Sequence, residues 1–413
     1  MEWVACVGID WAEEEHAYTI QTPDGAKTSG RMRSSPEDVH EWVRMLRQRF
    51  TSGMIVVAIE QGRTSLLYAL MAYEFLALVP INPRASKAYR ESLRLSGSSS
   101  DPVDADLICD FAVKHLPALR VWQPDDTLTR KLRMLVETRR TLVDQRTGLT
   151  HTLAATLKGY FPQPLQWFGG EGASLLWVMM ERWPTLEQLL GATVDEILGV
   201  LRAKRCRRAS ARAQELFDQI HAAVPLTRDT AMIEASSVYA QTLIRILTPL
   251  EAAIEMYDTI IASVWATHPD RQIFESLPGA GPVLAPRLAV AFGSDRERYD
   301  QAADLQCYSG IAPVTEKSGR SVWVHARWGY PVFLHQTFHE FAASSMPHCK
   351  WAHAFYQQQC ERGAERHQAI RALAFRWIRI LFRLWENRQP YVESTYIEAL
   401  KKKRSPLVPR LAA

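Results

Sequence analysis

The chain has 413 residues, of which 47% are hydrophobic and 23% charged, and its formal net charge is +4. These values are ordinary for a globular protein of two or three domains and exclude a general polycation, so any nucleic-acid contacts must come from local basic clusters. The 6 cysteines form no CxxC pair, which argues against a zinc site and a disulfide framework. We find no signal peptide or membrane-length apolar run, and we expect a protein of the reducing cytoplasm without a membrane partner.

Residues 4–20 predict a buried strand, a charged turn and a second strand. Asp10 ends the first of these strands, and Glu60 ends another buried strand at residues 54–60. A carboxylate at the end of a buried strand is costly to desolvate unless it binds a cation or a hydrogen-bond donor. Taken alone, Asp10 fits equally well as a polar residue that opens a hairpin turn.

The first 120 residues alternate strands and helices, which predicts an α/β domain. Ser35 and Pro36 mark the start of a helix, and residues 76–83 predict a third strand. The next helix is basic and is followed by a flexible loop at residues 96–100. Its basic residues are Arg84, Lys87, Arg90 and Arg94.

After this loop, Asp101 suits an N-cap, Pro102 the first helical position and Asp104 the third. Both aspartates have an ordinary explanation, because acids cap helices and complement the helix dipole. They also share one helix face, which we expect to meet the strand ends carrying Asp10 and Glu60. Four carboxylates would repel one another there unless a divalent cation, Mg²⁺ or alternatively Mn²⁺, lies between them.

The middle of the chain predicts helices at residues 127–160, 174–190, 194–220 and 230–268. Two long helices that flank a break suggest an antiparallel coiled-coil stalk with a helical insertion at its tip, and oligomerisation alone would explain them equally well. The insertion carries a basic run without an acid: Arg202, Lys204, Arg205, Arg207, Arg208 and Arg212. Such a run is usually a solvated face, but it can also hold phosphates.

Residues 274–292 contain an apolar-Pro-Gly-x-Gly turn before a helix, which resembles half of a helix–hairpin–helix. Glycines in such a turn let backbone N–H groups approach a phosphate, but Gly-x-Gly turns are also common in ordinary loops. The last long helix, residues 367–388, is basic and aromatic, and core packing explains its aromatics more often than base stacking does. Its Arg376, Arg379 and Arg383 share a face, and the tail at 401–404 is expected to be disordered.

Five segments, taken in order, resemble the DEDD transposases of bacterial insertion sequences. These segments are VGIDWA, VAIEQG, SSSDPVDADLI, SLPGAGPVLAPRLAV, and YSGIAPVTEKSGRS followed by HARWG. The transposases in question are the bridge-RNA-guided recombinases, the one-hundred-and-ten family of insertion sequences. The resemblance covers roughly residues 1–120 and 270–390, and its specificity comes from the composite pattern.

The resemblance implies a RuvC-like, RNase H-type α/β domain at 1–122, a coiled-coil stalk with a helical insertion at 123–268, and a mainly α-helical transposase domain at 269–413. Its metal-binding tetrad is Asp10, Glu60, Asp101 and Asp104, and Mg²⁺ or Mn²⁺ is the implied cofactor. The serine nucleophile of the family matches Ser318, with Ser321 close by as the alternative.

The chain departs from the family pattern at a few positions. Lys317 precedes the serine where members often have an acid or a small residue, and Ser100 precedes the third acid where lysine or threonine is frequent. The basic-x-Gly step is Arg327-Trp328-Gly329. These departures bear on the choice between Ser318 and Ser321.

The implied activity is that of a DNA transposase, a recombinase that cuts and rejoins DNA through a serine–phosphodiester intermediate. Its implied partners are a structured non-coding guide RNA, target and donor double-stranded DNA, and further copies of the chain in a dimer or tetramer. Such an enzyme would work at the nucleoid in the bacterial cytoplasm. The candidate nucleic-acid-binding residues are Arg84, Lys87, Gly279, Gly281, Lys317, Arg320 and Arg327.

Three other functions fit parts of the pattern. A RuvC-like metal nuclease of the junction-resolving kind would use water and leave Ser318 as a turn residue. An actin-like sugar kinase also opens with Gly-Ile-Asp, but it needs glycine-rich phosphate loops that this chain lacks. A non-catalytic RNA-binding scaffold would not need all four acids.

Overall fold

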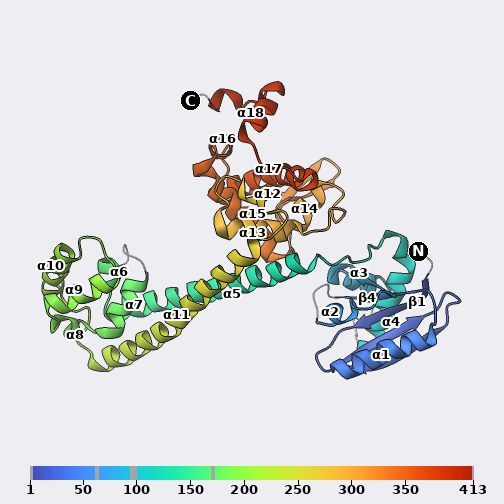
Figure 1. The fold of residues 1–413 in the computed structure, drawn as a ribbon, viewed down its shortest axis with the longest axis horizontal. Coiled ribbons are helices and arrows are strands. Elements are labelled where there is room, and N and C mark those ends of the chain that lie inside the picture. The colour runs from blue at the N-terminus through green and yellow to red at the C-terminus, as the bar shows by residue number, and fades with distance from the viewer. Residues whose placement is uncertain (1–2, 61–64, 94–99, 169–172, 412–413) are drawn as a thin grey trace. The chain divides into compact units, whose positions relative to one another are not determined.

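The computed structural model describes residues 3–60, 65–93, 100–168 and 173–411. The chain divides into two compact units, Met1–Pro124 and Asp125–Ala413 (Figure 1). Arg94 and the loop expected at 96–99 lie outside the described residues. The first unit is a mixed α/β structure, and the second is mostly helical.

The first unit is built on a five-stranded sheet with the strand order β3-β2-β1-β4-β5. Its strands are β1 (Trp3–Asp10), β2 (Glu15–Gln21), β3 (Lys27–Arg33), β4 (Met54–Ile59) and β5 (Leu76–Pro80). Strands β1, β2 and β3 pair antiparallel, whereas β4 is parallel to both β1 and β5. The edge strand β3 was not predicted, because its sequence is mostly polar and exposed.

Helices cover both faces of this sheet. Helices α1 (Pro36–Arg49) and α2 (Ser65–Leu70) pack on the face that carries Val7, Ile9 and Val57. Helix α4 (Asp101–His115), followed by the 3₁₀ helix η1 (Leu116–Ala118), packs on the opposite face. Helix α3 (Pro83–Leu93) contacts α4. The strand predicted to reach residue 83 ends at Pro80, because Asn82 Oδ1 accepts a hydrogen bond from the Arg84 N–H at 2.9 Å and begins α3.

Gly8 of β1 allows the closest approach between the sheet and α4. A Cβ at this position would lie 2.3 Å from the Cys109 nitrogen and 2.4 Å from the Ala105 carbonyl oxygen, both backbone atoms of α4. The alternation of β1 therefore directs Cys6, Gly8 and Asp10 toward α4. This contact sets the position of α4 against the carboxyl end of β1.

We predict that Gly8→Ala lowers the free energy of unfolding by about 2–3 kcal/mol, because the backbone of α4 must move to admit the methyl group. Gly148→Ala is the control, since no atom lies within 4 Å of the Cβ it would add. That substitution should raise the stability of α5 by roughly 0.5–1 kcal/mol. Calorimetric unfolding of both variants tests this, and an unchanged melting temperature for Gly8→Ala would contradict it.

Two long helices run side by side through the second unit (Figure 1). Helices α5 (Thr127–Tyr160) and α11 (Thr230–Trp265) are antiparallel, as the ion pairs Arg139–Asp258 and Arg146–Glu251 show. The chain between them forms a helical tip with its own apolar core. The tip helices are α6 (Gln163–Phe168), α7 (Ala173–Arg182), α8 (Leu186–Leu190), α9 (Val194–Ala203) and α10 (Ala209–His221).

Two single helices predicted in the tip are each broken in the structure. Pro184 separates α7 from α8, because proline lacks the N–H that would continue the helix. The helix predicted at 194–220 is two helices, α9 and α10, joined by a basic turn. In this turn Arg205 and Arg208 adopt φ values of 54° and 53°. Arginine rarely adopts this left-handed conformation, so no local residue pattern predicts the break.

The C-terminal body surrounds a core with three fully buried tryptophans, Trp351, Trp377 and Trp385. Its elements are α12 (Arg271–Glu275), α13 (Gly281–Phe292), α14 (Ala302–Tyr308), β6 (Val314–Ser318), β7 (Ser321–His325), α15 (Val332–Ser345), η2 (Met346–His348), α16 (Lys350–Glu361), α17 (Arg366–Asn387), α18 (Glu393–Lys402) and η3 (Val408–Leu411). The prediction that 401–404 is disordered was wrong, since Lys401 and Lys402 end α18. The two strands β6 and β7 were not predicted.

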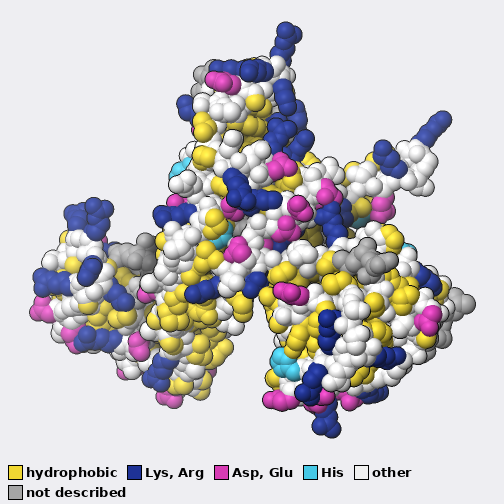
Figure 2. All heavy atoms as spheres, turned by 45° about the vertical axis from the view of Figure 1, so that its right-hand side comes forward, with side chains coloured by type: hydrophobic (Ala, Val, Ile, Leu, Met, Phe, Trp, Pro, Cys, Tyr) yellow, Lys and Arg dark blue, Asp and Glu magenta, His cyan; other side chains and the backbone are white. Residues whose placement is uncertain are grey.

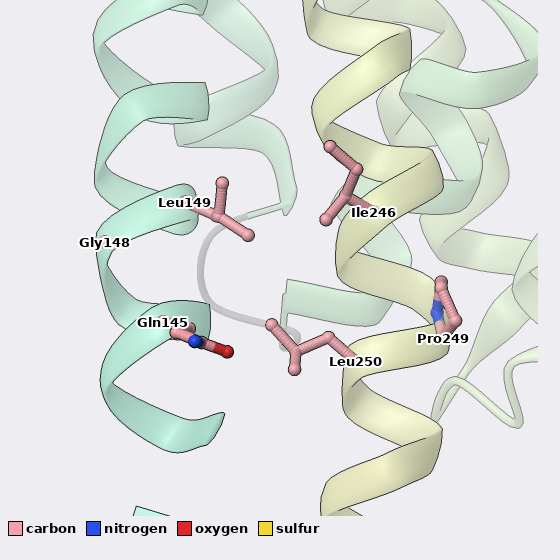
Figure 3. A pocket seen from close by; sticks show the side chains of 6 residues that line it. All are labelled: Gln145, Gly148, Leu149, Ile246, Pro249 and Leu250. Carbon is pink, nitrogen blue, oxygen red and sulfur yellow. The ribbon is translucent and has the colours of Figure 1, made fainter. Parts of the chain in front are cut away.

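The predicted division into 1–122, 123–268 and 269–413 stays a prediction, because the long helices, the tip and the C-terminal body fall in one compact unit. Within the described residues, no helix is long and apolar enough to cross a membrane. An open apolar depression lies between α5 and α11 (Figure 3). It is lined by Gln145, Gly148, Leu149, Ile246, Pro249 and Leu250.

Candidate active site

Two of the predicted acids lie at the carboxyl ends of neighbouring parallel strands. Ile9 of β1 is in register with Ile59 of β4, so Asp10 and Glu60 each follow one member of this pair. The alternation of both strands directs these two carboxylates to the face that α4 covers. Register and alternation together make Asp10 and Glu60 neighbours.

The other two acids lie in the first turn of α4. The N-cap of this helix is Ser100, so Asp101 is the first helical residue and not the cap, a difference of one position from the prediction. Asp101 is exposed, whereas Asp104 is 9% exposed and faces the sheet. Because α4 packs its Ala105 and Cys109 against Gly8, its first turn extends toward the end of β1 at Asp10.

The charges of the four carboxylates act on one another. Burial, followed by the charges of Asp104, Glu60 and Asp101, raises the pKa of Asp10 to about 6. The pKa of Glu60 is also raised, first by burial and then by Asp104, against an opposing effect of Arg90. The structure thus brings the four predicted acids into one electrostatic cluster at the carboxyl ends of β1 and β4.

Arg90 of α3 belongs to this acid cluster and was not predicted as a site residue. Its Nε lies 3.2 Å from Asp104 Oδ1, and its charge lowers the pKa of Asp10. The sequence placed Arg90 only among the basic residues of its helix. Its proximity to Asp104 depends on how α3 packs beside α4, and local sequence patterns do not predict this packing.

The donor set of the cluster fits a hard divalent cation, because it consists of carboxylate oxygens that repel one another without one. As the side chains stand, no three His, Cys, Asp or Glu residues in the described ranges are arranged to hold a metal ion. The neighbouring carboxylates are therefore close enough to raise the pKa of Asp10 and of Glu60, but the four acids do not form a closed ligand shell. A bound ion would require side-chain movement.

Ser318 lies at the tip of a hairpin in the second unit. Strands β6 and β7 pair antiparallel with Ser318 opposite Ser321, and Gly319 in the turn has a φ of 57°. Both serines are exposed and share one face of the hairpin. The tip therefore presents the hydroxyl of either serine to a large partner.

The same face carries residues that sequence reasoning did not single out. His325 Nε2 lies 3.1 Å from Glu316 Oε1, and the His325 ring stacks on Trp323 with ring centroids 4.2 Å apart. Trp323 is nevertheless 59% exposed. Cross-strand register creates this face, so it becomes visible only once β6 and β7 are known to pair.

The base of the hairpin is anchored to the C-terminal body. Gly310 has a φ of 71°, and a Cβ there would lie 2.3 Å from the Tyr330 ring. Tyr330 stacks on His335 of α15, whose Nδ1 lies 3.2 Å from the Ser309 carbonyl oxygen. The two ends of the hairpin segment are thereby held together while its tip stays exposed.

The glycine turn predicted to bind phosphate is partly a packing feature. A Cβ on Gly279 would lie 2.3 Å from the Ser344 carbonyl oxygen, and Ser344 Oγ donates a hydrogen bond to the Gly279 carbonyl at 2.7 Å. Gly279 thus allows α15 to approach the turn. Gly281 is exposed at the start of α13, with a φ of 56°, and no atom lies within 4 Å of the Cβ that a side chain would add there.

The predicted basic contacts occupy different surroundings. Arg84 and Lys87 are exposed on α3, and Lys317 and Arg320 are exposed on the serine hairpin. Arg327 is half-buried, and its guanidinium donates to Cys307 Sγ at 3.7 Å. On the face drawn in Figure 2, Lys and Arg side chains form separate groups and no continuous basic surface.

Two further basic groups differ in exposure. In the tip, Arg202, Lys204, Arg205, Arg207 and Arg208 are exposed, whereas Arg212 donates to the Trp167 carbonyl at 2.8 Å. On α17, Trp377 and Trp385 are buried in the core, as packing predicted. Arg379 and Arg383 of that helix are exposed.

Comparison with known proteins matches two segments of the chain to transposase families. Residues 7–162, which include the four acids, match a family model described as a transposase and named for a DEDD motif and for IS110. Residues 271–357, which include Ser318, match the model of the transposase IS116/IS110/IS902 family.

Three relatives match nearly the whole length of this chain. The mini-circle putative transposase for IS117 of Streptomyces coelicolor is 26% identical over 94% of this chain and 95% of its own length. The IS900 protein of Mycobacterium paratuberculosis is 24% identical over 94% of this chain and 97% of its own length. The IS116 protein of Streptomyces clavuligerus is 25% identical, with coverages of 93% and 95%. The chain belongs to the IS110 family of insertion-sequence transposases.

Proposed function

We propose that this transposase is an RNA-guided DNA recombinase that cuts and rejoins target and donor DNA through a serine–phosphodiester intermediate. The observation that carries the proposal is the presence of two features in the same chain. One is the coupled acid cluster of Asp10, Glu60, Asp101 and Asp104, and the other is the exposed hairpin tip at Ser318.

The sheet of the first unit supports an RNase H-type, RuvC-like assignment for this domain. Three antiparallel strands followed by two parallel ones place the ends of β1 and β4 side by side at its centre. Acids at these ends, with a third and fourth on the helix across the same face, form the arrangement expected of a DEDD domain. The carboxylates of Asp10, Glu60, Asp101 and Asp104 would hold Mg²⁺ or Mn²⁺.

A divalent ion held there would stabilise the negative charge that develops on the scissile phosphate and its leaving oxygen. The chain supplies the nucleophile. Ser318 Oγ forms a bond to phosphorus while the bond from phosphorus to the leaving sugar oxygen breaks. The Ser318 hydroxyl proton passes to a base, and the leaving oxygen takes up a proton. Attack on this phosphoserine link by a sugar hydroxyl of the other DNA reseals the strand and frees Ser318, so no net hydrolysis occurs.

The partners are a structured guide RNA together with target and donor DNA. A protein that delegates sequence recognition to RNA pairing needs only contacts to phosphates and to nucleic-acid shape. The modest net charge of +4 and the separate basic groups agree with that requirement. We assign Lys317 and Arg320 to the DNA beside the scissile phosphate, because both are exposed on the hairpin that carries Ser318.

We predict that Lys317→Ala and Arg320→Ala each reduce the slope of log affinity against log salt by about 1, because each removes one phosphate contact. Fluorescence anisotropy with labelled DNA across a salt series measures this slope. Arg362→Ala, at an exposed arginine that ends α16, is the control and should leave the slope unchanged. Equal slopes for all three variants would remove the hairpin from the DNA interface.

A dimer or tetramer would build its interface on the long helices. Apolar side chains on α5 and α11 remain exposed, among them Met134, Val238, Ile246 and Met256. The open apolar depression between the two helices adds to this surface (Figure 3). Exposed apolar residues that gather on one surface are typical of a site where another protein chain packs.

The proposed function is tested with purified protein, the RNA encoded beside its gene, labelled DNA and Mg²⁺. Denaturing gels should show a protein–DNA adduct that requires all of these components. Cleavage without any adduct would favour a metal nuclease that uses water. A reaction that proceeds equally well without RNA would show that the recombinase does not require a guide RNA.

A further inference from the structure

Arg90 couples two structural elements of the acid cluster. It lies on α3, and its Nε is 3.2 Å from Oδ1 of Asp104 on α4. The two side chains are 26% and 11% exposed, so the pair is largely shielded from water. Shielding strengthens the attraction between the two charges relative to a surface ion pair.

The charge of Arg90 reaches beyond Asp104. It opposes the rise in the pKa of both Asp10 and Glu60, which burial and the neighbouring acids produce. One guanidinium thus offsets part of the repulsion among three carboxylates. In the protein without metal, Arg90 supplies positive charge where the proposed function requires a divalent ion.

A divalent ion that takes Oδ1 of Asp104 as a ligand would compete with Arg90 for this oxygen, because Arg90 Nε lies 3.2 Å from it and the two positive charges repel each other at short range. A ligand shell that includes this oxygen therefore requires the Arg90–Asp104 pair to open. With the side chains as they stand, no three His, Cys, Asp or Glu residues in the described ranges are placed to hold an ion.

We propose that Arg90 is an internal counter-ion that neutralises the acid cluster in the absence of metal and is displaced from Asp104 when a divalent ion binds. This inference rests on the proposed metal site. It makes Arg90 a positioning residue that sets the metal affinity of the site. A simpler explanation is that the pair only fastens α3 to α4. In that case its loss would lower stability and leave metal affinity unchanged.

The test measures Mn²⁺ binding to the full chain without nucleic acid, by electron paramagnetic resonance of the free ion. Two neutral variants, Arg90→Met and Arg90→Gln, should bind Mn²⁺ about tenfold more tightly than the wild type, since the competing charge is gone. Arg90→Lys retains the charge and should stay close to the wild type. Arg44→Met is the matched control, because Arg44 pairs with Glu41 on the exposed face of α1 in the same unit.

The melting temperature, measured with and without Mn²⁺, distinguishes a counter-ion from an ion pair that only holds α3 against α4. Without metal, the neutral variants should melt below the wild type, and saturating Mn²⁺ should reduce this gap. If the ion pair only holds α3 against α4, the difference in melting temperature should be the same with and without Mn²⁺. Circular dichroism establishes that each variant is folded before binding is measured, and the two neutral side chains give independent routes to a folded protein.

The outcomes distinguish this inference from the proposed function. If wild type binds Mn²⁺ and Asp10→Asn abolishes the binding, the metal site stands. An unchanged or weaker affinity in the neutral Arg90 variants would then overturn the counter-ion alone. If the wild type shows no binding that depends on Asp10, both the metal site and the counter-ion are overturned.

Discussion

Ser318→Ala is expected to abolish the covalent protein–DNA adduct and to reduce strand exchange by about 10³-fold or more, because the reaction loses its nucleophile. The hairpin should keep its shape, since Ser318 is exposed and its side chain is small. The measurement is the amount of adduct on a denaturing gel after reaction with guide RNA, both DNAs and Mg²⁺.

Ser321→Ala is the control for this substitution. Ser321 is the cross-strand partner of Ser318, on the same face of the same hairpin and equally exposed. Because the resemblance to the family places the nucleophile at Ser318, the Ser321→Ala variant should retain most of the adduct. Loss of the adduct in Ser321→Ala alone would identify Ser321 as the nucleophile in place of Ser318. Full activity in both variants would contradict a serine mechanism.

Asp10→Asn is expected to stop DNA cleavage while making the metal-free protein more stable. The pKa of Asp10 is raised to about 6 in the folded chain, from an ordinary value of 3.8. Since the raised pKa disfavours the charged form in the fold, ionised Asp10 destabilises the protein at neutral pH. After allowance for solvent screening, the neutral amide should raise the free energy of unfolding by about 1–2 kcal/mol.

The pH dependence of this gain provides an additional check. Folding raises the pKa of Asp10, so the cost of its charge is absent below pH 4 and grows until the pH passes about 6. The difference in stability between Asp10→Asn and wild type should therefore be largest above pH 6 and vanish near pH 4. Thermal unfolding in chelator across this range measures it.

Asp106→Asn is the matched control for Asp10→Asn. Asp106 lies on α4 two residues after Asp104, but its side chain is 41% exposed and forms an ion pair with Lys27 at 2.6 Å. Its neutralisation should lower stability slightly or leave it unchanged. A stabilising effect of equal size in both variants would mean that removing any negative charge stabilises the unit and would contradict a special repulsion at Asp10.

The four acids of the cluster were predictable because each of them follows a local rule. Asp10 and Glu60 end apolar strands, and Asp101 and Asp104 lie on either side of Pro102, which marks the start of a helix. Parallel pairing of β1 and β4 confirmed that the strand ends meet. Only the start of α4 shifted, with Ser100 as the N-cap, since capping residues alone do not fix a helix boundary to one position.

The features that were missed depend on contacts between distant segments. Arg90 reaches Asp104 through the packing of α3 beside α4, and the face shared by Ser318, Trp323 and His325 depends on the register of β6 and β7. The short, exposed strands of this hairpin carry no apolar alternation with a buried side. The break between α9 and α10 depends on left-handed arginines such as Arg205, a conformation that arginine does not favour.

The amino acid that carries DNA in the reacting wild-type protein can be identified directly. The complete reaction would be stopped with denaturant, digested with nuclease and protease, and analysed by tandem mass spectrometry. We expect a nucleotide attached to Ser318, formed only when RNA, DNA and Mg²⁺ are all present. Efficient cleavage of DNA with no nucleotide on any serine of the hairpin would contradict it.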